Sequence, residues 1–410
     1  MKREKSTMSQ YMSQAQVSNE PEAPDTSALK VCSDDQTNVF VTAALDTVGR
    51  LVELEFKHTI VPVFLLKILT LCIPFQQNLN KLTIQSCPIS DKAICEISTF
   101  LPQSQITEIC FDESPLPTCN YGLLLERQTQ LKSLSLNRCC IDDSDCSDIV
   151  AKLAYPAPSC RSLTILSLAS NFITDKGGLD ISSMLRTNRS LRYLNLSGNH
   201  ITDTGAFSIF SCLMKFPLTP EEINTKRVRN LQYLKSYREV YEKCYKDIIT
   251  SFNEKAFDDR SGGRKRITQR RSTIAVAVTP GHGAVADAAF KAEAMTIDII
   301  GRNDDPFSNN DTHYLNGYLY CNGNMSLAYL DMSFNKMSHL SIVKLVEVMR
   351  YQESSLRKSE YGLIRVVMDG NLLPAASVHL DQLQELIERA TFRRLEGPLN
   401  KSEKKINRKR

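Results

Sequence analysis

The residues of this sequence that are best suited to chemistry are its thiols and imidazoles. The chain has 13 cysteines and 6 histidines in 410 residues, and these residue types serve as metal ligands, nucleophiles and general bases. Such roles require a defined constellation, and no nucleophile elbow, zinc-protease motif or kinase set occurs here. Gly281-His282-Gly283 lacks the remaining residues of a phosphate-binding loop. The sequence therefore predicts no enzyme, no cofactor and no metal site.

The cysteines fit a structural role better than a catalytic one. Cys87 and Cys139 occupy a slot of a repeated motif that elsewhere holds asparagine, and no two matching Cys-x-x-Cys pairs accompany them. Cys139 and Cys140 are adjacent, which constrains them too tightly for an ordinary disulfide. An odd number of cysteines without an apolar leader favours free thiols in a reducing compartment. We therefore expect buried thiols in a cytoplasmic protein.

A repeated pattern of leucines determines where the other residues lie. The motif L-x-x-L-x-L-x-x-N-x-I occurs at residues 163–173 and again at 191–201, as in proteins that stack one structural unit per copy. Leu166 and Leu168 alternate with Ser167, so one face of a strand would be buried and the other would face solvent. The motif therefore predicts a short, half-buried strand in each copy.

The remainder of each copy predicts a turn and a returning helix. Asn171 ends the strand, where its amide can bond backbone groups that a buried bend would leave unpaired. Apolar residues then follow at helical spacing, and Thr174 or Asp175 can cap the helix. The repeat from Leu163 to Leu191 is 28 residues long, which leaves room for a full helix.

Weaker copies extend the pattern along the chain, beginning at Leu51, Leu79, Ile106, Leu131, Leu327 and Leu363. With the first two copies they make eight repeats, closed by a capping helix at about 377–394. They resemble leucine-rich repeats of the ribonuclease-inhibitor type, including an I-T-D-x-G join at 173–177 and 201–205. The predicted fold is an α/β leucine-rich repeat solenoid with parallel strands on the concave face and helices on the convex face. A largely helical and disordered insertion interrupts it.

Composition divides the chain into five parts. These are a disordered N-terminal tail at 1–35, the first repeats at 36–216, a basic insertion at 217–313, the last repeats and capping helix at 314–394, and a basic C-terminal tail at 395–410. Thr219-Pro220-Glu221-Glu222 is a helix start, and apolar residues at intervals of three and four extend a long amphipathic helix to Phe252. Its apolar face would either pack on the repeats or bind a partner. Residues 261–290 are expected to be unstructured.

Positive charge gathers in two segments. Residues 215–273 contain fifteen Lys and Arg against eight Asp and Glu, and residues 393–410 contain eight against two. Because the net charge of the whole chain is +4, the solenoid itself is mildly acidic. No aromatic residues are interleaved with the basic patch, which disfavours nucleic acid, whereas an acidic protein surface such as that of tubulin matches it. The patch consists of Arg264, Lys265, Arg266, Arg270 and Arg271.

Two threonines in this segment are candidates for phosphorylation. Thr268 and Thr273 follow basic residues in the arrangement that basophilic kinases favour. Phosphate on either residue would cancel nearby positive charge. The alternative interpretation is that the basic run is a solvated linker or a localisation signal. No membrane is expected, since the most apolar stretch, at 60–75, is too short to span a bilayer.

The predicted binding site lies on the solvent-facing strand positions, which line the concave surface of a solenoid. Tyrosine and arginine at such positions are enriched at interface hot spots. The alternative is that any repeat face carries some polar and aromatic groups without binding a partner. The candidate residues are Lys132, Arg138, Arg192, Tyr193, Asn195, Tyr329, Asp331, Phe334, Arg365 and Asp369.

The joins and the basic insertion before the last two repeats make the chain similar to leucine-rich repeat proteins of motile cilia and sperm flagella. The resemblance covers about residues 45–390 and implies a non-enzymatic scaffold of the axoneme or cytoplasm, with tubulin or other axonemal proteins as partners. Two alternatives stay open. One is a regulator of a small GTPase, although the GTPase-activating protein for Ran ends in an acidic stretch and residues 401–410 are basic. The other is an actin-binding module like that of tropomodulin.

Overall fold

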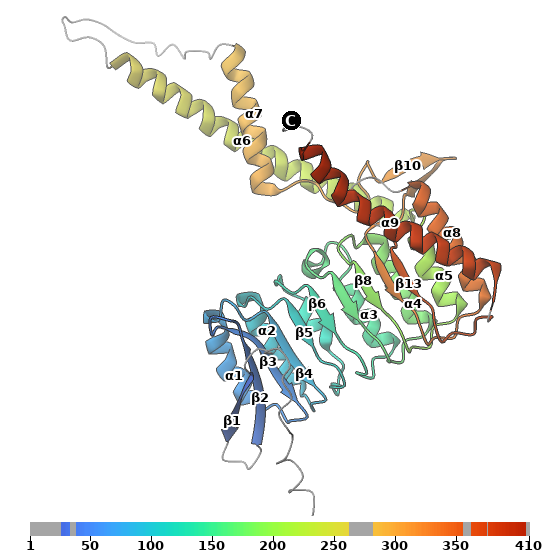
Figure 1. The fold of residues 1–410 in the computed structure, drawn as a ribbon. Helices are drawn as coiled ribbons and strands as arrows, with labels where there is room; N and C mark the ends of the chain where they lie inside the picture. Colours follow the sequence, from blue (N-terminus) through green and yellow to red (C-terminus); the bar gives the residue numbers. More distant parts are fainter. Residues whose placement is uncertain (1–25, 33–37, 262–281, 356–361, 375, 407–410) are drawn as a thin grey trace, which may run out of the picture.

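A sheet of ten short strands, with helices along one side, forms the body of the molecule (Figure 1). The computed structural model describes residues 26–32, 38–261, 282–355, 362–374 and 376–406. In their order across the sheet, the strands are β1 (Thr26–Cys32), β2 (Asn38–Leu45), β3 (Leu51–Lys57), β4 (Lys81–Gln85), β5 (Glu108–Cys110), β6 (Ser133–Ser135), β7 (Ile165–Ser167), β8 (Tyr193–Asn195), β12 (Tyr329–Asp331) and β13 (Arg365–Val367). The α-helices are α1 (Val63–Cys72), α2 (Asp91–Phe100), α3 (Asp143–Ala151), α4 (Asp175–Thr187), α5 (Asp203–Cys212), α8 (His339–Ser355) and α9 (Val378–Ile406). Short 3-10 helices lie at Ile73–Phe75, Leu101–Gln103, Tyr121–Leu125 and Pro158–Arg161.

All strand pairs from β3 to β13 are parallel and share one register. Leu166 lies beside Leu134 on one side and beside Leu194 on the other, and Leu194 in turn lies beside Leu330. The pairing of β8 with β12 joins repeats that are distant in the sequence. The insertion therefore leaves and returns without breaking the sheet, and the predicted α/β solenoid is confirmed.

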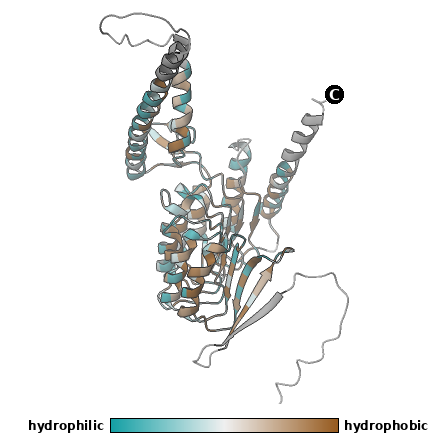
Figure 2. Ribbon diagram, turned by 90° about the vertical axis from the view of Figure 1, so that its left-hand side faces the viewer, coloured by the Kyte–Doolittle hydropathy of each residue, from teal (hydrophilic) through white to brown (hydrophobic). Residues whose placement is uncertain are grey.

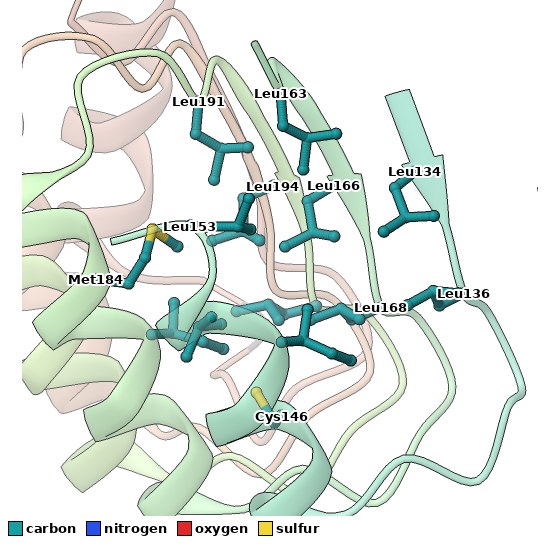
Figure 3. Close-up of a cluster of buried hydrophobic side chains, with 14 of the residues drawn as sticks. Leu134, Leu136, Cys146, Leu153, Leu163, Leu166, Leu168, Met184, Leu191 and Leu194 are labelled. Carbon is teal, nitrogen blue, oxygen red and sulfur yellow. The ribbon is translucent and has the colours of Figure 1, made fainter. Parts of the chain in front are cut away.

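Leucines of the motif fill the space between strands and helices (Figure 3). Leu134, Leu166 and Leu194 are fully buried, and Cys146 and Met184 meet this layer from the helical side. Burying such side chains contributes roughly 1.5 to 3 kcal/mol each relative to exposure. Because each repeat covers the apolar side of its neighbour, the core is continuous along the solenoid.

The asparagine slot joins each repeat to the previous one. Asn171 Oδ1 accepts the backbone N–H groups of Cys139 (3.0 Å) and Ile141 (3.2 Å), and its Nδ2 donates to Leu136 O at 2.9 Å. In one of the two copies that have cysteine in this slot, the buried Cys139 Sγ donates to Phe111 O at 3.1 Å. Two predictions for this slot are therefore confirmed. Asparagine bonds the backbone of the bend, and cysteine is a packed thiol.

The aspartate of each join forms a second ladder on the helical side. Asp175 accepts hydrogen bonds from Thr202 N (2.7 Å), Thr202 Oγ1 (2.6 Å) and Gly205 N (3.0 Å). A Cβ atom at Gly205 would lie 2.7 Å from Asp175 Oδ1, so this position must be glycine. Asp203 bonds Ser338 N (2.9 Å) and Oγ (2.6 Å) in the same way. This contact ties the repeats on the two sides of the insertion together.

Acid should loosen this ladder. Burial raises the pKa of Asp203, but hydrogen bonds from Ser338 and Ser341 outweigh burial and hold that pKa below its ordinary value. Burial also raises the pKa of Asp143, and hydrogen bonds from Thr174 outweigh burial there. The pKa of Asp143 therefore lies below its ordinary value as well. A carboxyl with a depressed folded-state pKa stabilises the fold above its unfolded pKa, and this contribution is lost as pH falls through the folded pKa. We therefore expect the urea midpoint to fall from about pH 5 to about pH 3.

The variant Asp203→Asn tests the origin of this pH dependence. It removes one of the two carboxyls, so its urea midpoint should change less between the same two pH values than that of the wild-type protein. Circular dichroism at each urea concentration reports the unfolding. An unchanged pH dependence in the variant would contradict the role assigned to Asp203.

An antiparallel hairpin closes the first end of the sheet. Strand β1 pairs with β2 from Thr26 opposite Ala44 to Cys32 opposite Asn38, and β2 pairs antiparallel with β3. The expected disordered tail at 1–35 is therefore wrong for residues 26–32. Strand β3 would otherwise present an unpaired edge, and Val39 of β2 is buried against the first repeat.

The insertion forms an arm that projects from the solenoid (Figures 1 and 2). The arm consists of α6 (Pro220–Ser261) and α7 (His282–Ile300). The predicted helix start is confirmed, because Glu222 N donates to Thr219 Oγ1 (3.2 Å) while Thr219 N donates to the Glu222 carboxylate (2.8 Å). This reciprocal pair is a capping box. Helix α6 extends beyond the predicted end at Phe252.

The two arm helices pack on each other. Ala288, Ala292 and Thr296 of α7 are fully buried, and their small size allows a close approach between helices. The expectation that residues 261–290 are unstructured is wrong from His282 onward, since alanine has the highest helix propensity. Successive tyrosine rings lie 6.1, 6.3 and 6.0 Å apart along α6, at Tyr233, Tyr237, Tyr241 and Tyr245.

The chain forms a short hairpin at the predicted return boundary of 314. Strands β10 (Thr312–Leu315) and β11 (Tyr318–Cys321) form a hairpin, and β11 pairs with β9 (Phe216–Pro217) of the outgoing chain. Asn316 and Gly317 have φ values of 50° and 84°, as a type I′ turn requires. This three-stranded sheet therefore joins the outgoing and returning chain where the arm meets the solenoid core.

The last helix closes the solenoid as predicted. Its first turn is capped where His379 N donates to Ser377 Oγ at 3.1 Å, and Leu383 and Leu386 are buried against the core. Helix α9 then continues to Ile406, into the predicted tail. No helix in the described part of the chain is long and apolar enough to cross a membrane. The basic patch at Arg264, Lys265, Arg266, Arg270 and Arg271 and the candidate sites Thr268 and Thr273 lie outside the described residues.

Candidate protein-interaction face

The face of the sheet opposite the helices, here called the open face, carries a row of aromatic and basic side chains. Tyr193, Tyr329 and Arg365 occupy the same register position on β8, β12 and β13. The two tyrosine rings are stacked, with centroids 4.3 Å apart and planes 7° apart. The Arg365 guanidinium lies over the Tyr329 ring at 5.8 Å. We call these three residues the aromatic row.

Tyr193 of the row remains neutral at physiological pH. Burial raises the pKa of Tyr193, and Tyr329 and Asp331 add to the rise. A neutral phenol can donate and accept hydrogen bonds while its ring offers apolar area. The aromatic row therefore combines a rigid apolar surface, hydroxyl groups and one cation.

A second row of predicted residues serves the sheet as well as the surface. Asn195 Oδ1 accepts from Ser197 N at 2.9 Å. Asp331 Oδ1 accepts from Ser333 N (3.0 Å) and Ser333 Oγ (2.6 Å). These bonds close the turns after β8 and β12, so both side chains are held in place beside the aromatic row.

The remaining predicted residues lie at the margins of the open face. Lys132 and Arg192 precede β6 and β8, where their backbone N–H groups donate to Thr107 O and Thr164 O, each at 2.8 Å. Arg138 follows β6 and forms an ion pair with Glu113 at 2.8 Å. The structure therefore places Lys132 and Arg138 two strands away from the aromatic row.

Phe334 and Asp369 follow β12 and β13 on the opposite margin. Phe334 N donates to Asp369 O at 2.7 Å, and the Phe334 side chain is 67% exposed. Its φ of 54° is a left-handed conformation that bulky residues rarely adopt. The ring covers Gly370, where an added Cβ would lie 2.4 Å from Phe334 Cδ1. Phe334 is therefore an exposed aromatic residue held in a costly backbone conformation.

Replacement of Phe334 by asparagine should not destabilise the protein. Asparagine tolerates the left-handed conformation, and little buried apolar area is lost. We expect Phe334→Asn to raise the free energy of unfolding by up to about 1 kcal/mol, measured by urea denaturation. A loss of stability would show that the ring packs more favourably than its exposure indicates.

Two features of this face were missed by the sequence analysis. Ile165 lies beside Tyr193 in register and is 40% exposed, so it extends the aromatic row by one apolar residue. Ile165 occupies the same motif position as Tyr193, and this equivalence could have identified it from the sequence. Ser167, predicted to face solvent, is buried and donates to Asn137 Oδ1 at 2.7 Å. Hydrogen bonds between polar side chains of neighbouring repeats, such as this one, therefore cover part of the open face.

Two thiols, Cys110 of β5 and Cys139 after β6, are poor nucleophiles. Burial raises the pKa values of Cys110 and Cys139 to about 11, so both thiols are protonated and weakly nucleophilic at neutral pH. Within the described ranges, no group of three or more His, Cys, Asp or Glu residues is arranged to hold a metal ion.

The strand-turn-helix units, their asparagine ladder and their shared register define a leucine-rich repeat solenoid. The model of the Leucine Rich repeat family matches residues 159–182 and 187–210, which contain β7 with the start of α4 and β8 with most of α5. The chain therefore has a leucine-rich repeat solenoid fold, and two of its repeats match the family model. A comparison with curated proteins gave no match.

Proposed function

We propose that this protein is a non-enzymatic scaffold that binds a protein partner on its open face, centred on the aromatic row. Leucine-rich repeat domains generally mediate protein interactions. The observation that carries the proposal is the stacked pair Tyr193 and Tyr329 beside Arg365. Tyrosine and arginine are over-represented among the residues that dominate binding energy.

A more specific proposal follows from the arrangement of the chain. The joins, the 28-residue repeat and the insertion before the last two repeats support the ribonuclease-inhibitor type and a similarity to leucine-rich repeat-containing protein seventy-one. On this basis the protein is a component of motile cilia or flagella with tubulin or other axonemal proteins as partners. The excess of Lys and Arg at 215–273 and 393–410 favours acidic partners of this kind.

Fractionation of ciliated tissue tests the cellular part of the proposal. The tagged protein should remain with the axoneme after detergent extraction and leave it as salt is raised, because the proposed contacts are partly electrostatic. A protein that is fully soluble at low salt would contradict the axonemal assignment. In that case GTP hydrolysis by small GTPases, assayed with and without the protein, tests the regulator alternative.

A further inference from the structure

The outer side of the arm carries an apolar stripe that no other part of the described chain covers. Val228, Leu231 and Leu234 of α6 are 45%, 59% and 51% exposed. Their spacing of three residues places them along one side of the helix. The stripe lies within the first half of α6, close to the solenoid end of the arm.

The opposite side of α6 is fixed by buried polar contacts. Arg229 and Asp305 form an ion pair at 2.5 Å, with 16% and 8% of their side chains exposed. Lys226 Nζ donates to Thr312 Oγ1 at 3.0 Å. These contacts hold the base of the arm, so the outer side is presented in a fixed orientation.

The cations of this segment are divided between the two sides. Residues 223–238 contain five Lys and Arg and no Asp or Glu. Two of them, Lys226 and Arg229, make the inner contacts, whereas Arg227, Lys235 and Arg238 are exposed. The exposed cations therefore lie on the same side of α6 as the apolar stripe. Arg238 forms an ion pair with Glu242 one turn further along, at 2.8 Å. Arg227 and Lys235 leave the surface near the stripe positive, because residues 223–238 contain no Asp or Glu.

We propose that this surface, the arm patch, docks an acidic amphipathic helix of a partner protein. Val228, Leu231, Lys235 and Arg238 follow intervals of three, four and three, the spacing of a helix-pairing seam. The apolar residues supply contact area, and the cations select a partner with carboxylates beside its apolar stripe. The arm patch consists of Arg227, Val228, Leu231, Leu234, Lys235 and Arg238.

The same observations argue against two other occupants. A second copy of the arm patch would bring like charges together, which opposes self-association through this face. A helix that lies on a membrane surface presents a wide apolar face with aromatic anchors. Here three aliphatic residues form a stripe of two turns, and the chain has no tryptophan. The surface is separate from the open face, so the inference does not depend on the proposed function.

Fluorescence anisotropy with a designed peptide tests the proposal on the full chain. The probe is a helical peptide of about 21 residues with leucine at the seam positions and glutamate beside them, and its counterpart has lysine in place of glutamate. The wild-type protein should bind the glutamate peptide and not the lysine peptide. Leu231→Ser and Leu234→Ser should each weaken binding about tenfold. Arg227→Glu with Lys235→Glu should reverse the preference between the two peptides.

Matched controls separate docking from non-specific adhesion. Leu71 on α1 is 73% exposed, and Leu71→Ser makes the same chemical change at the other end of the solenoid, so binding should be unaltered. Equal affinity for both peptides, no binding of either peptide, or unchanged binding by the Leu231 and Leu234 variants would overturn the proposal. The proposal would also be overturned if these substitutions left peptide binding unchanged and instead weakened binding to anionic phosphatidylserine vesicles or self-association of the protein.

Discussion

Replacement of Asn335 by alanine should lower the free energy of unfolding by on the order of 3 kcal/mol. Asn335 is buried, and its Oδ1 accepts the backbone N–H of Ile201 at 3.0 Å. Its Nδ2 donates to Leu196 O (2.9 Å), Met332 O (3.1 Å) and Ser333 O (3.1 Å). Alanine would leave the N–H and these carbonyl groups without the side-chain partner. The effect is large because Asn335 joins the repeats on the two sides of the insertion.

Urea denaturation followed by circular dichroism measures this effect. We expect the midpoint of Asn335→Ala to fall by about 1 M relative to the wild-type protein. Asn224→Ala, on the exposed side of α6, is the matched control and should leave the midpoint unchanged. Equal midpoints for the Asn335 variant and the wild-type protein would show that the solenoid does not depend on the ladder across the insertion.

Removal of the aromatic side chains from the open face should abolish partner binding there. The triple variant Tyr193→Ala, Tyr329→Ala and Phe334→Ala deletes the stacked pair and the exposed ring at the margin of the open face. Central aromatic hot spots each contribute 2 kcal/mol or more, so we expect a loss of about a hundredfold or greater. Quantitative mass spectrometry of proteins recovered with the tagged chain measures the loss.

A second triple variant controls for the general removal of aromatic surface. Phe40, Phe64 and Phe75 are also exposed, and they lie in the first strands and helices of the solenoid. Their replacement by alanine should leave the recovered partners unchanged. Equal recovery with both triple variants would contradict the placement of the binding site at the aromatic row.

The solenoid could be predicted because the copies of its motif bury apolar side chains at the same positions and bond the same bend. Leu166 and Leu194 must point to one layer, and Asn171 and Asn199 must bond the bend before them, whichever neighbours they have. Each copy therefore carries its own local signal. The aromatic row was accessible for the same reason, since Tyr193 and Tyr329 occupy equivalent motif positions.

The features that sequence reasoning missed depend on contacts between unlike segments. Strand β1 forms because the edge of the first repeats accepts a partner, and nothing in residues 26–32 repeats the motif. Helix α7 is stabilised by its packing on α6, and residues 282–300 alone do not reveal that contact. Ion pairs between side chains also depend on residues that are distant in the sequence. Arg138, for example, is paired with Glu113.

Site-specific photo-cross-linking tests the central claim most directly. A benzophenone amino acid placed at Tyr329 samples the open face, and the same residue at Leu179, exposed on α4, samples the helical side. In the native tissue extract we expect covalent protein adducts from position 329 and few or none from position 179. Adducts that arise from position 179 and not from position 329 would show that the partner binds the helical side, and the proposed role of the open face would be wrong.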